Sequence, residues 1–294
     1  MVRVQIQLPL NISRSLEDSL REHIETNAGE YPTEILLENS HACGGKNATD
    51  LKHAKHADIM IGFMPELAMQ TDEYLLEHII SAPRRFPINE ELQDQGFADP
   101  RGCFHIFGSV PFTMFYNPDY TDASEVPRTW SELLDPKWKD RIMMPGKEHM
   151  APRVIRAFLK HDNLGKAPAV DENITCSGMP PNVIEAVKNG KFALGITNIT
   201  FGKISESQKI RMIWPADGLL CMPQIMVWKK GLDERMMKLG DFLLTPKVQN
   251  LLRQQTFVPM ASGTEFPEMI RANQVGLKWT GWDNFREAMK NSEI

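Results

Sequence analysis

The sequence predicts an α/β protein with two lobes, each lobe a doubly wound mixed sheet. Strand-like runs alternate with amphipathic helical runs over the first 63 residues, and the same alternation restarts after residue 141. One extended apolar run, near residues 108–117, lies between these stretches, and another, near residues 218–228, follows the second stretch. We therefore expect lobe 1 to comprise residues 1–110 and 220–294, lobe 2 to comprise residues 118–217, and the two extended runs to be the crossings.

The first lobe begins in strand–helix order. Residues 2–8 alternate apolar and polar side chains, which predicts a strand. Residues 13–27 carry an apolar side chain at every fourth position from Leu16, which predicts a helix with Ser13 as its N-cap. The elements expected next are a strand at 34–37, a helix at 48–56 and a strand at 58–63.

The second lobe follows a change in the sequence pattern. Residues 104–117 predict two extended runs separated by Gly108, Ser109 and Pro111. Beyond them we expect strands at 141–144, 192–197 and 210–214, and helices at 181–189 and at 152–161, the last opened by a proline. Residues 218–228 would return the chain to the first lobe, where helices at 232–244 and 246–255 are expected to finish it.

Composition narrows the function classes. With 42% hydrophobic and 24% charged residues the chain reads as a folded globular protein. The net charge of −5 argues against a nucleic-acid binder, which would show a clustered basic face. Since no apolar run approaches the roughly 20 residues that span a bilayer, no direct membrane insertion is expected.

Motifs between residues 116 and 260 resemble a known family. Residues 116–119 read YNPD and residues 126–139 read VPRTWSELLDPKWK. Further segments read NGKFALGIT at 189–197, WPADG at 214–218, FLLTPKVQ at 242–249 and FVP at 257–259. In this order they resemble the extracellular solute-binding proteins of ABC importers.

The resemblance implies a type II periplasmic-binding-protein-like clamshell, with two α/β lobes, two extended crossings and a ligand cleft between the lobes. A ligand that contacts both lobes would favour the closed state and drive hinge closure. The implied function is capture of a small polar ligand, without catalysis, for the membrane subunits of an ABC importer. The implied location is periplasmic or extracellular, with the leader absent from this chain, and a cytoplasmic location is the alternative.

Candidate ligand residues follow from the placement of strands. In open α/β sheets ligands bind beyond the carboxyl ends of the strands, where loops lead into helix N-termini. The loop after the second strand is rich in polar groups and has two glycines that permit close backbone approach. The candidates are Ser40, His41, Cys43, Gly44 and Gly45 in that loop, Lys147, His149 and Arg153 in its second-lobe counterpart, Thr197 and Asn198 after a later strand, and Ser109 near the first crossing.

Two ligand chemistries remain open. Loop amides with Lys147 or Arg153 would suit an anion. His41, Cys43 and His149 would offer nitrogen and sulfur donors to a transition-metal ion bound as the ligand, and no other cofactor is expected. Members of the resembling family that bind ferric iron use adjacent tyrosines in the second lobe. Because this chain has no tyrosine beyond Tyr120, a phenolate-type ferric site is not expected.

Two other function classes compete with solute binding. Cys43 lies on a glycine-rich loop before a predicted helix, a setting that lowers a thiol pKa, and His41 is the nearest candidate base. A cysteine-dependent enzyme on the same fold is therefore one alternative. An intracellular ligand sensor that uses the same clamshell without a transporter is the other.

Overall fold

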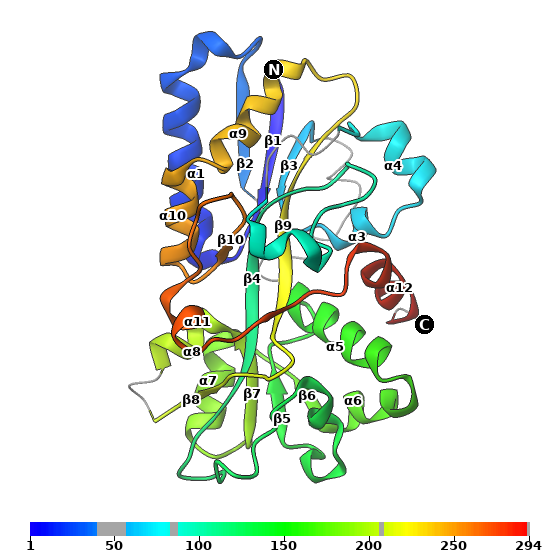
Figure 1. Cartoon of the computed structure of the whole chain (residues 1–294), viewed down its shortest axis with the longest axis vertical. Helices are drawn as coiled ribbons and strands as arrows, with labels where there is room; N and C mark the ends of the chain where they lie inside the picture. Colours follow the sequence, from blue (N-terminus) through cyan, green and yellow to red (C-terminus); the bar gives the residue numbers. More distant parts are fainter. Residues whose placement is uncertain (40–56, 83–87, 206–208, 293–294) are drawn as a thin grey trace. The chain divides into compact units, whose positions relative to one another are not determined.

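The computed structural model describes residues 1–39, 57–82, 88–205 and 209–292 (Figure 1). The chain divides into two compact units. Unit 1 comprises Met1–Ser109, Pro223–Pro267 and Thr280–Trp282, and unit 2 comprises Val110–Met222, Glu268–Trp279 and Asp283–Ile294. This division differs from the expected ranges after residue 267, because most of the C-terminal segment groups with unit 2.

The sheet of unit 1 is mixed. Strand β1 (Val2–Gln7) lies between β2 (Ile35–Asn39) and β3 (Ile59–Gly62), parallel to both. The end of β9 (Leu219–Trp228) pairs antiparallel with β3. In β1 the side chains of Val2, Val4 and Ile6 are buried whereas Arg3 is exposed, so the alternation in the sequence reflects a strand with one face in the core.

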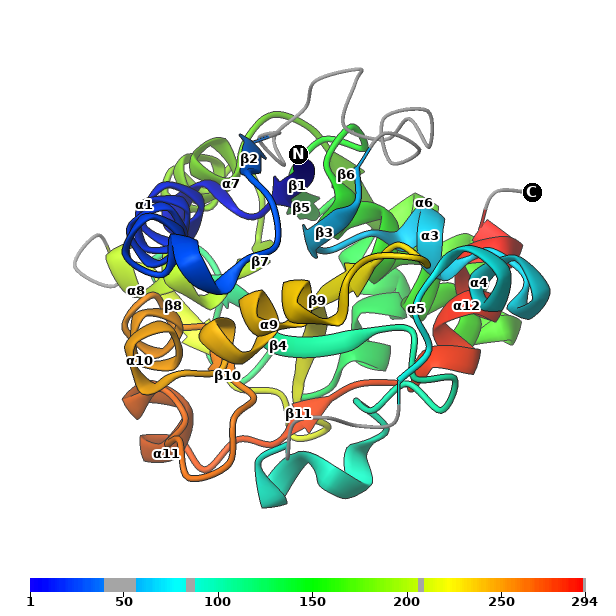
Figure 2. The same ribbon diagram turned by 90° about the horizontal axis from the view of Figure 1, so that it is seen from above.

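Helix α1 (Leu10–Thr26) connects β1 to β2 and packs with α9 (Lys238–Leu243) and α10 (Pro246–Gln254) (Figure 2). Its buried side chains include Leu16 and Leu20, as the spacing predicted. The expected N-cap at Ser13 is wrong. The helix starts after Pro9, whose carbonyl accepts from the amides of Ile12 and Ser13, and this places Ser13 inside the helix, where it is buried.

The later part of the chain is helical where expected, over 234–243, but it departs from the prediction in two respects. The helix expected over 232–244 is a 3-10 turn, η7 (Glu234–Met237), that continues into α9, because the Asp233 carboxylate accepts from the Arg235 amide and fixes the start at Glu234. The chain also continues in regular structure after α10. The remaining elements are β10 (Val258–Pro259), α11 (Glu268–Ala272), β11 (Leu277–Lys278) and α12 (Trp282–Ser292).

Strand β4 (His105–Tyr116) is one continuous strand, so the expected pair of extended runs is also wrong. Gly108 fits because a Cβ there would lie 3.1 Å from a Leu252 methyl group. Pro111 cannot donate a ladder hydrogen bond, and it lies between Ser109, which pairs with β10, and Phe112, which pairs with β7. Both potential breakers therefore occupy positions where the strand tolerates them.

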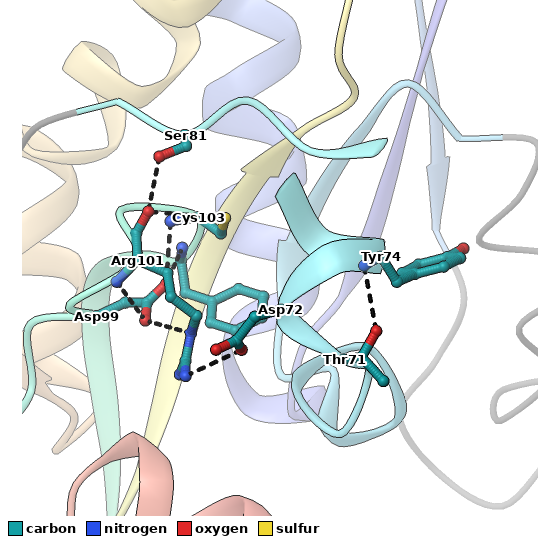
Figure 3. Close-up of polar contacts among 8 residues, drawn as sticks. Thr71, Asp72, Tyr74, Ser81, Asp99, Arg101 and Cys103 are labelled. Carbon is teal, nitrogen blue, oxygen red and sulfur yellow. Dashed lines mark hydrogen bonds and ion pairs between the residues drawn. The ribbon is translucent and has the colours of Figure 1, made fainter. Parts of the chain in front are cut away.

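A buried charged turn precedes β4 in unit 1 (Figure 3). The fully buried Asp99 carboxylate accepts hydrogen bonds from the amides of Arg101, Cys103 and Phe104. The Arg101 guanidinium, with its side chain 10% exposed, lies 3.1 Å from Asp99 and 3.5 Å from Asp72. Burial raises the pKa of the Cys103 thiol to about 11, so this thiol is protonated at neutral pH.

Gln249 of α10 organises the other side of β4 in unit 1. Its buried amide donates to the carbonyls of Phe107 and Leu243 at 2.9 and 2.8 Å. Its carbonyl oxygen accepts from the amides of Met260 and Ala261 at 2.8 and 3.0 Å. One side chain thereby satisfies four buried backbone groups around the strand that carries Ser109.

Unit 2 has its own mixed sheet. Strand β5 (Ile142–Met144) lies between β6 (Ile174–Cys176) and β7 (Leu194–Asn198), parallel to both, and β4 pairs antiparallel with β7. Short strands β8 (Arg211–Ile213) and β11 pair with β4 and β9. The helices of this unit are α5 (Met150–Asp162), α6 (Ala167–Asn173), α7 (Pro180–Lys188) and α8 (Ile199–Ser205).

The remaining short elements belong to loops. In unit 1 they are η1 (Ala28–Glu30), α3 (Pro65–Ala68), α4 (Asp72–His78) and η2 (Glu90–Gln95). In unit 2 they are η3 (Trp130–Leu134), η4 (Pro136–Trp138) and η5 (Leu164–Lys166). The tryptophans of the resembling motif, Trp130 and Trp138, are buried in η3 and η4.

We expect the stability of unit 1 to fall below pH 6.5 through His23 of α1. Its ring stacks on Phe242 at 4.1 Å, and its Nε2 atom lies 3.0 Å from the Tyr31 hydroxyl. Burial lowers the pKa of His23 below its usual 6.5, outweighing the opposite influence of Glu30, while Lys247 lowers it further. The folded state thus favours neutral His23, and stability present above pH 6.5 is lost as the pH falls through the lower folded pKa.

Thermal melts of the wild type and of His23→Gln across this pH range check the expectation. The matched control is His78→Gln, which replaces an exposed histidine of α4. The His23 variant should show a shallower acid loss than the wild type, whereas the control should follow the wild type. Parallel curves for wild type and His23→Gln would contradict this role.

Candidate functional site

The predicted second-lobe loop lies at the carboxyl edge of the unit 2 sheet. Met144, the last residue of β5, pairs with Cys176, the last residue of β6. Two backbone hydrogen bonds join the loops that follow. The Ser177 amide donates to the Met144 carbonyl at 3.0 Å, and the Gly146 amide donates to the Gly178 carbonyl at 2.8 Å. Lys147 and His149 follow β5 at this edge, and β7 runs parallel to β5. Thr197 and Asn198, expected after a strand, are instead the last two residues of β7, because both still pair with β4.

Helix α5 begins at this edge. His149 is its N-cap, with an extended backbone, and its side chain makes no capping hydrogen bond. No acidic side chain occupies the first turn. The helix starts two residues before the expected position, and Pro152 lies inside the first turn, where its missing N–H is tolerated. The amides and the positive end of the helix dipole therefore favour an anion here.

Two candidate residues at this edge carry buried polar atoms without a hydrogen-bond partner among the described residues. These atoms are Nε2 of His149, whose residue is 7% exposed, and Oδ1 of Asn198, whose residue is 9% exposed. The Glu148 carboxylate lies 3.7 Å from Nε2, too far for a hydrogen bond. Since leaving a buried polar group unpaired costs about 1–3 kcal/mol, a ligand that accepts from Nε2 or donates to Oδ1 would gain affinity.

Positive charge gathers around the same loop. Burial raises the pKa of the Cys176 thiol above its usual value. The positive charges of Arg156 and, to a smaller extent, Lys147 oppose this rise. The Arg153 guanidinium lies 3.8 Å from the Met150 sulfur, in the first turn of α5. Thr197, the other candidate in this unit, is 2% exposed at the end of β7.

The candidates of unit 1 are only partly described. Ser109 lies on β4 with 0% exposure, pairs with Val258, and its hydroxyl has no hydrogen-bond partner within the described ranges. Ser40, His41, Cys43, Gly44 and Gly45 lie outside the described residues, as does the helix expected over 48–56. The predicted metal set therefore retains only His149 within the described part of the chain.

The tyrosines lie away from this edge of unit 2. Tyr116 pairs with Leu194, the first residue of β7, at the opposite end of that strand from Asn198. Tyr120 is 59% exposed and its ring covers Gly190. Tyr31 and Tyr74 belong to unit 1, where they contact His23 and His78. Within the described ranges, no three His, Cys, Asp or Glu side chains are grouped so that they could hold a metal ion.

Sequence reasoning missed two charged groups. One is the buried Asp99–Arg101 pair of unit 1, and the other is Lys278 of unit 2, whose Nζ lies between the carboxylates of Asp162 and Asp217. Asp99 and Arg101 belong to one turn that has no regular sequence pattern. The partners of Lys278 are distant in sequence, so no local pattern indicates either group.

Comparisons with known proteins identify the class. The family model for bacterial extracellular solute-binding proteins matches residues 57–288, so the chain belongs to this family. The family assignment confirms the resemblance to solute-binding proteins of ABC importers, whose partners are a small ligand and membrane transporter subunits. No curated protein matches the chain. No helix among the described residues is long and apolar enough to cross a membrane.

Solved structures of similar fold include three named for iron. The ferric binding protein from Campylobacter jejuni matches with a TM-score of 0.74 at 14% identity, and the match covers 100% of this chain and 97% of that protein. The apo ferric ion-binding protein A of Pasteurella haemolytica scores 0.73 at 13% identity over 99% and 96%. Iron-bound HitA from Pseudomonas aeruginosa scores 0.70 at 14% identity over 100% of both chains. These matches confirm the predicted fold.

Proposed function

We propose that the chain binds a small anion at the carboxyl edge of unit 2 and delivers it, outside the cytoplasm, to the membrane subunits of an ABC importer. The observation that carries the proposal is the buried Nε2 of His149, unpaired among the described residues, at the start of α5. The family supports the transport role and the extracytoplasmic location. Closure of two lobes around the ligand, expected from the sequence, stays a prediction.

The cationic side chains of Lys147 and Arg153 outnumber the Glu148 carboxylate in this segment, which supports an anion. The first amides of α5 and the Lys147 and Arg153 side chains are donors, and an imidazole nitrogen such as Nε2 of His149 can also donate. An oxyanion accepts hydrogen bonds on every oxygen, so it can pair with several of them at once. Charge-assisted bonds of this kind contribute about 1.5–3 kcal/mol each, enough for micromolar affinity from a few contacts.

A metal ion is the second candidate ligand. It is supported by the iron in the names of the structural relatives and by the capacity of neutral imidazole to ligate transition metals. The donors proposed for it are His149 together with His41 and Cys43. A ferric site built on paired phenolates receives no support from Tyr116 or Tyr120, given where they lie in unit 2.

Catalysis is not proposed. Cys43 and His41, on which the enzyme alternative depends, lie outside the described residues, and the family is one of solute-binding proteins. The sensor alternative likewise has no observation in its favour.

A thermal-shift screen of phosphate, sulfate, small carboxylates and transition-metal salts tests the proposal. We expect an oxyanion to stabilise the wild type by about 2.7 kcal/mol at a hundredfold excess over its dissociation constant. His149→Ala combined with Lys147→Ala should lose most of this stabilisation. Lys188→Ala, which removes a partly exposed charge from α7 of the same unit, is the matched control and should keep it.

Two outcomes would overturn the anion. Stabilisation by metal salts alone, abolished by a chelator, would replace it with the metal ion. An oxyanion shift of full size in the double variant would place the ligand elsewhere on the chain.

A further inference from the structure

A polar cavity lies within unit 2, apart from the described candidate residues. Its volume is about 370 Å³, within the range of small-molecule sites. It opens among η3, the C-terminal end of α5 and the segments that lead into β9 and β11. Its lining includes Trp130, Ser131, Asp162, Asn163, Asp217 and Lys278.

The lining contains one ammonium group, that of Lys278, which is paired with two carboxylates. Nζ of Lys278 lies 3.0 Å from Oδ2 of Asp217 and 3.5 Å from Oδ2 of Asp162. Asp217 is held in place because it also accepts from the backbone amide of Trp130 at 3.2 Å. All three charged side chains are 26–30% exposed, so a ligand can reach them while water screens them only in part.

The charge pattern selects the class of ligand. A simple anion would meet two carboxylates, and a simple cation would meet the Lys278 ammonium, so each would face a like charge. A zwitterion with neighbouring ammonium and carboxylate groups complements both signs. The carbonyl end of the α5 dipole and the excess of one carboxylate favour its ammonium group.

This cavity is distinct from the proposed anion site. His149 and Asp162 lie at opposite ends of α5, a helix of 13 residues that spans about 20 Å. None of the predicted ligand residues that the structure describes lines the cavity.

We propose that this cavity is a second binding site, for a small zwitterion of the α-amino acid class. The ammonium group of the ligand binds Asp162 and Asp217, its carboxylate binds Lys278, and Ser131 and Asn163 supply neutral hydrogen-bonding groups. Because Asp217 precedes β9 and Lys278 lies on β11, which pairs with β9, occupancy would tie the start of β9 to the end of α5.

Calorimetric titration of the full chain with L-glutamine, butylamine hydrochloride and sodium butyrate tests the site. L-glutamine should bind, and the two singly charged probes, which carry only one of its groups, should not. Asp162→Asn should weaken L-glutamine binding about tenfold or more through loss of one charge-assisted contact. Glu185→Gln, an exposed carboxylate of α7 outside the cavity, is the matched control and should bind like the wild type.

The controls keep this site separate from the anion site. The His149→Ala, Lys147→Ala double variant should retain L-glutamine binding even though it loses the oxyanion shift. Absence of L-glutamine binding, equal binding of butylamine, or undiminished binding in Asp162→Asn would each overturn the zwitterion site. None of these results would bear on the anion proposal.

Discussion

Replacing Asp99 by alanine should destabilise unit 1 by about 3–5 kcal/mol, the usual cost of removing one partner from a buried ion pair. The Asp99 side chain has no exposed surface, and it neutralises Arg101, which is 10% exposed. It also accepts from three backbone amides in the turn before β4. The substitution leaves the buried guanidinium without its counter-charge and these amides without their acceptor. The free-energy costs of the two losses add.

Urea unfolding followed by a probe in unit 1 measures this loss, and Asp72→Ala is the matched control. Asp72 pairs with the same guanidinium at 3.5 Å but is 54% exposed, so its removal should cost less than about 1 kcal/mol. Equal effects of the two substitutions would show that burial does not set the strength of these pairs.

Gln249→Ala should cost unit 1 on the order of 4 kcal/mol. The substitution leaves the carbonyls of Phe107 and Leu243 and the amides of Met260 and Ala261 without their partner. Each buried unpaired group costs about 1–3 kcal/mol, and relaxation around the cavity sets the final value.

The same unfolding measurement applies, with Gln254→Ala as the matched control on the exposed face of α10. The control should shift stability by less than about 0.5 kcal/mol. A loss of similar size in both variants would contradict the role of Gln249 as the shared partner of four backbone groups.

The sequence predicted those parts of the fold that depend on local periodicity. The strand over 2–8 and the helix that follows it carry patterns of period two and four, and both elements form. The break expected at Gly108 and Pro111 does not occur, because contacts with α10 and a change of strand partner accommodate these residues. Tertiary contacts of this kind leave no trace in a window of neighbouring residues.

The candidate site shows the same limit. The order of strands predicted that Lys147, His149, Thr197 and Asn198 lie beyond strand ends. In unit 2, Lys147 and His149 follow β5, whereas Thr197 and Asn198 are the last two residues of β7, which runs parallel to β5. Which of their polar atoms lack partners depends on packing around His149 and Asn198, and this cannot be read from spacing. The Lys278 triad joins residues from three distant segments and was invisible for the same reason.

The most direct test of the central claim is a nitrogen-15 spectrum of the histidine side chains, with and without the oxyanion identified by the screen. The His149 signals can be assigned by their loss in His149→Gln. If the carboxyl edge of unit 2 holds the ligand, the Nε2 resonance of His149 should move on saturation while that of the exposed His78 stays in place. A saturated protein in which the His149 resonance is unchanged would contradict the account.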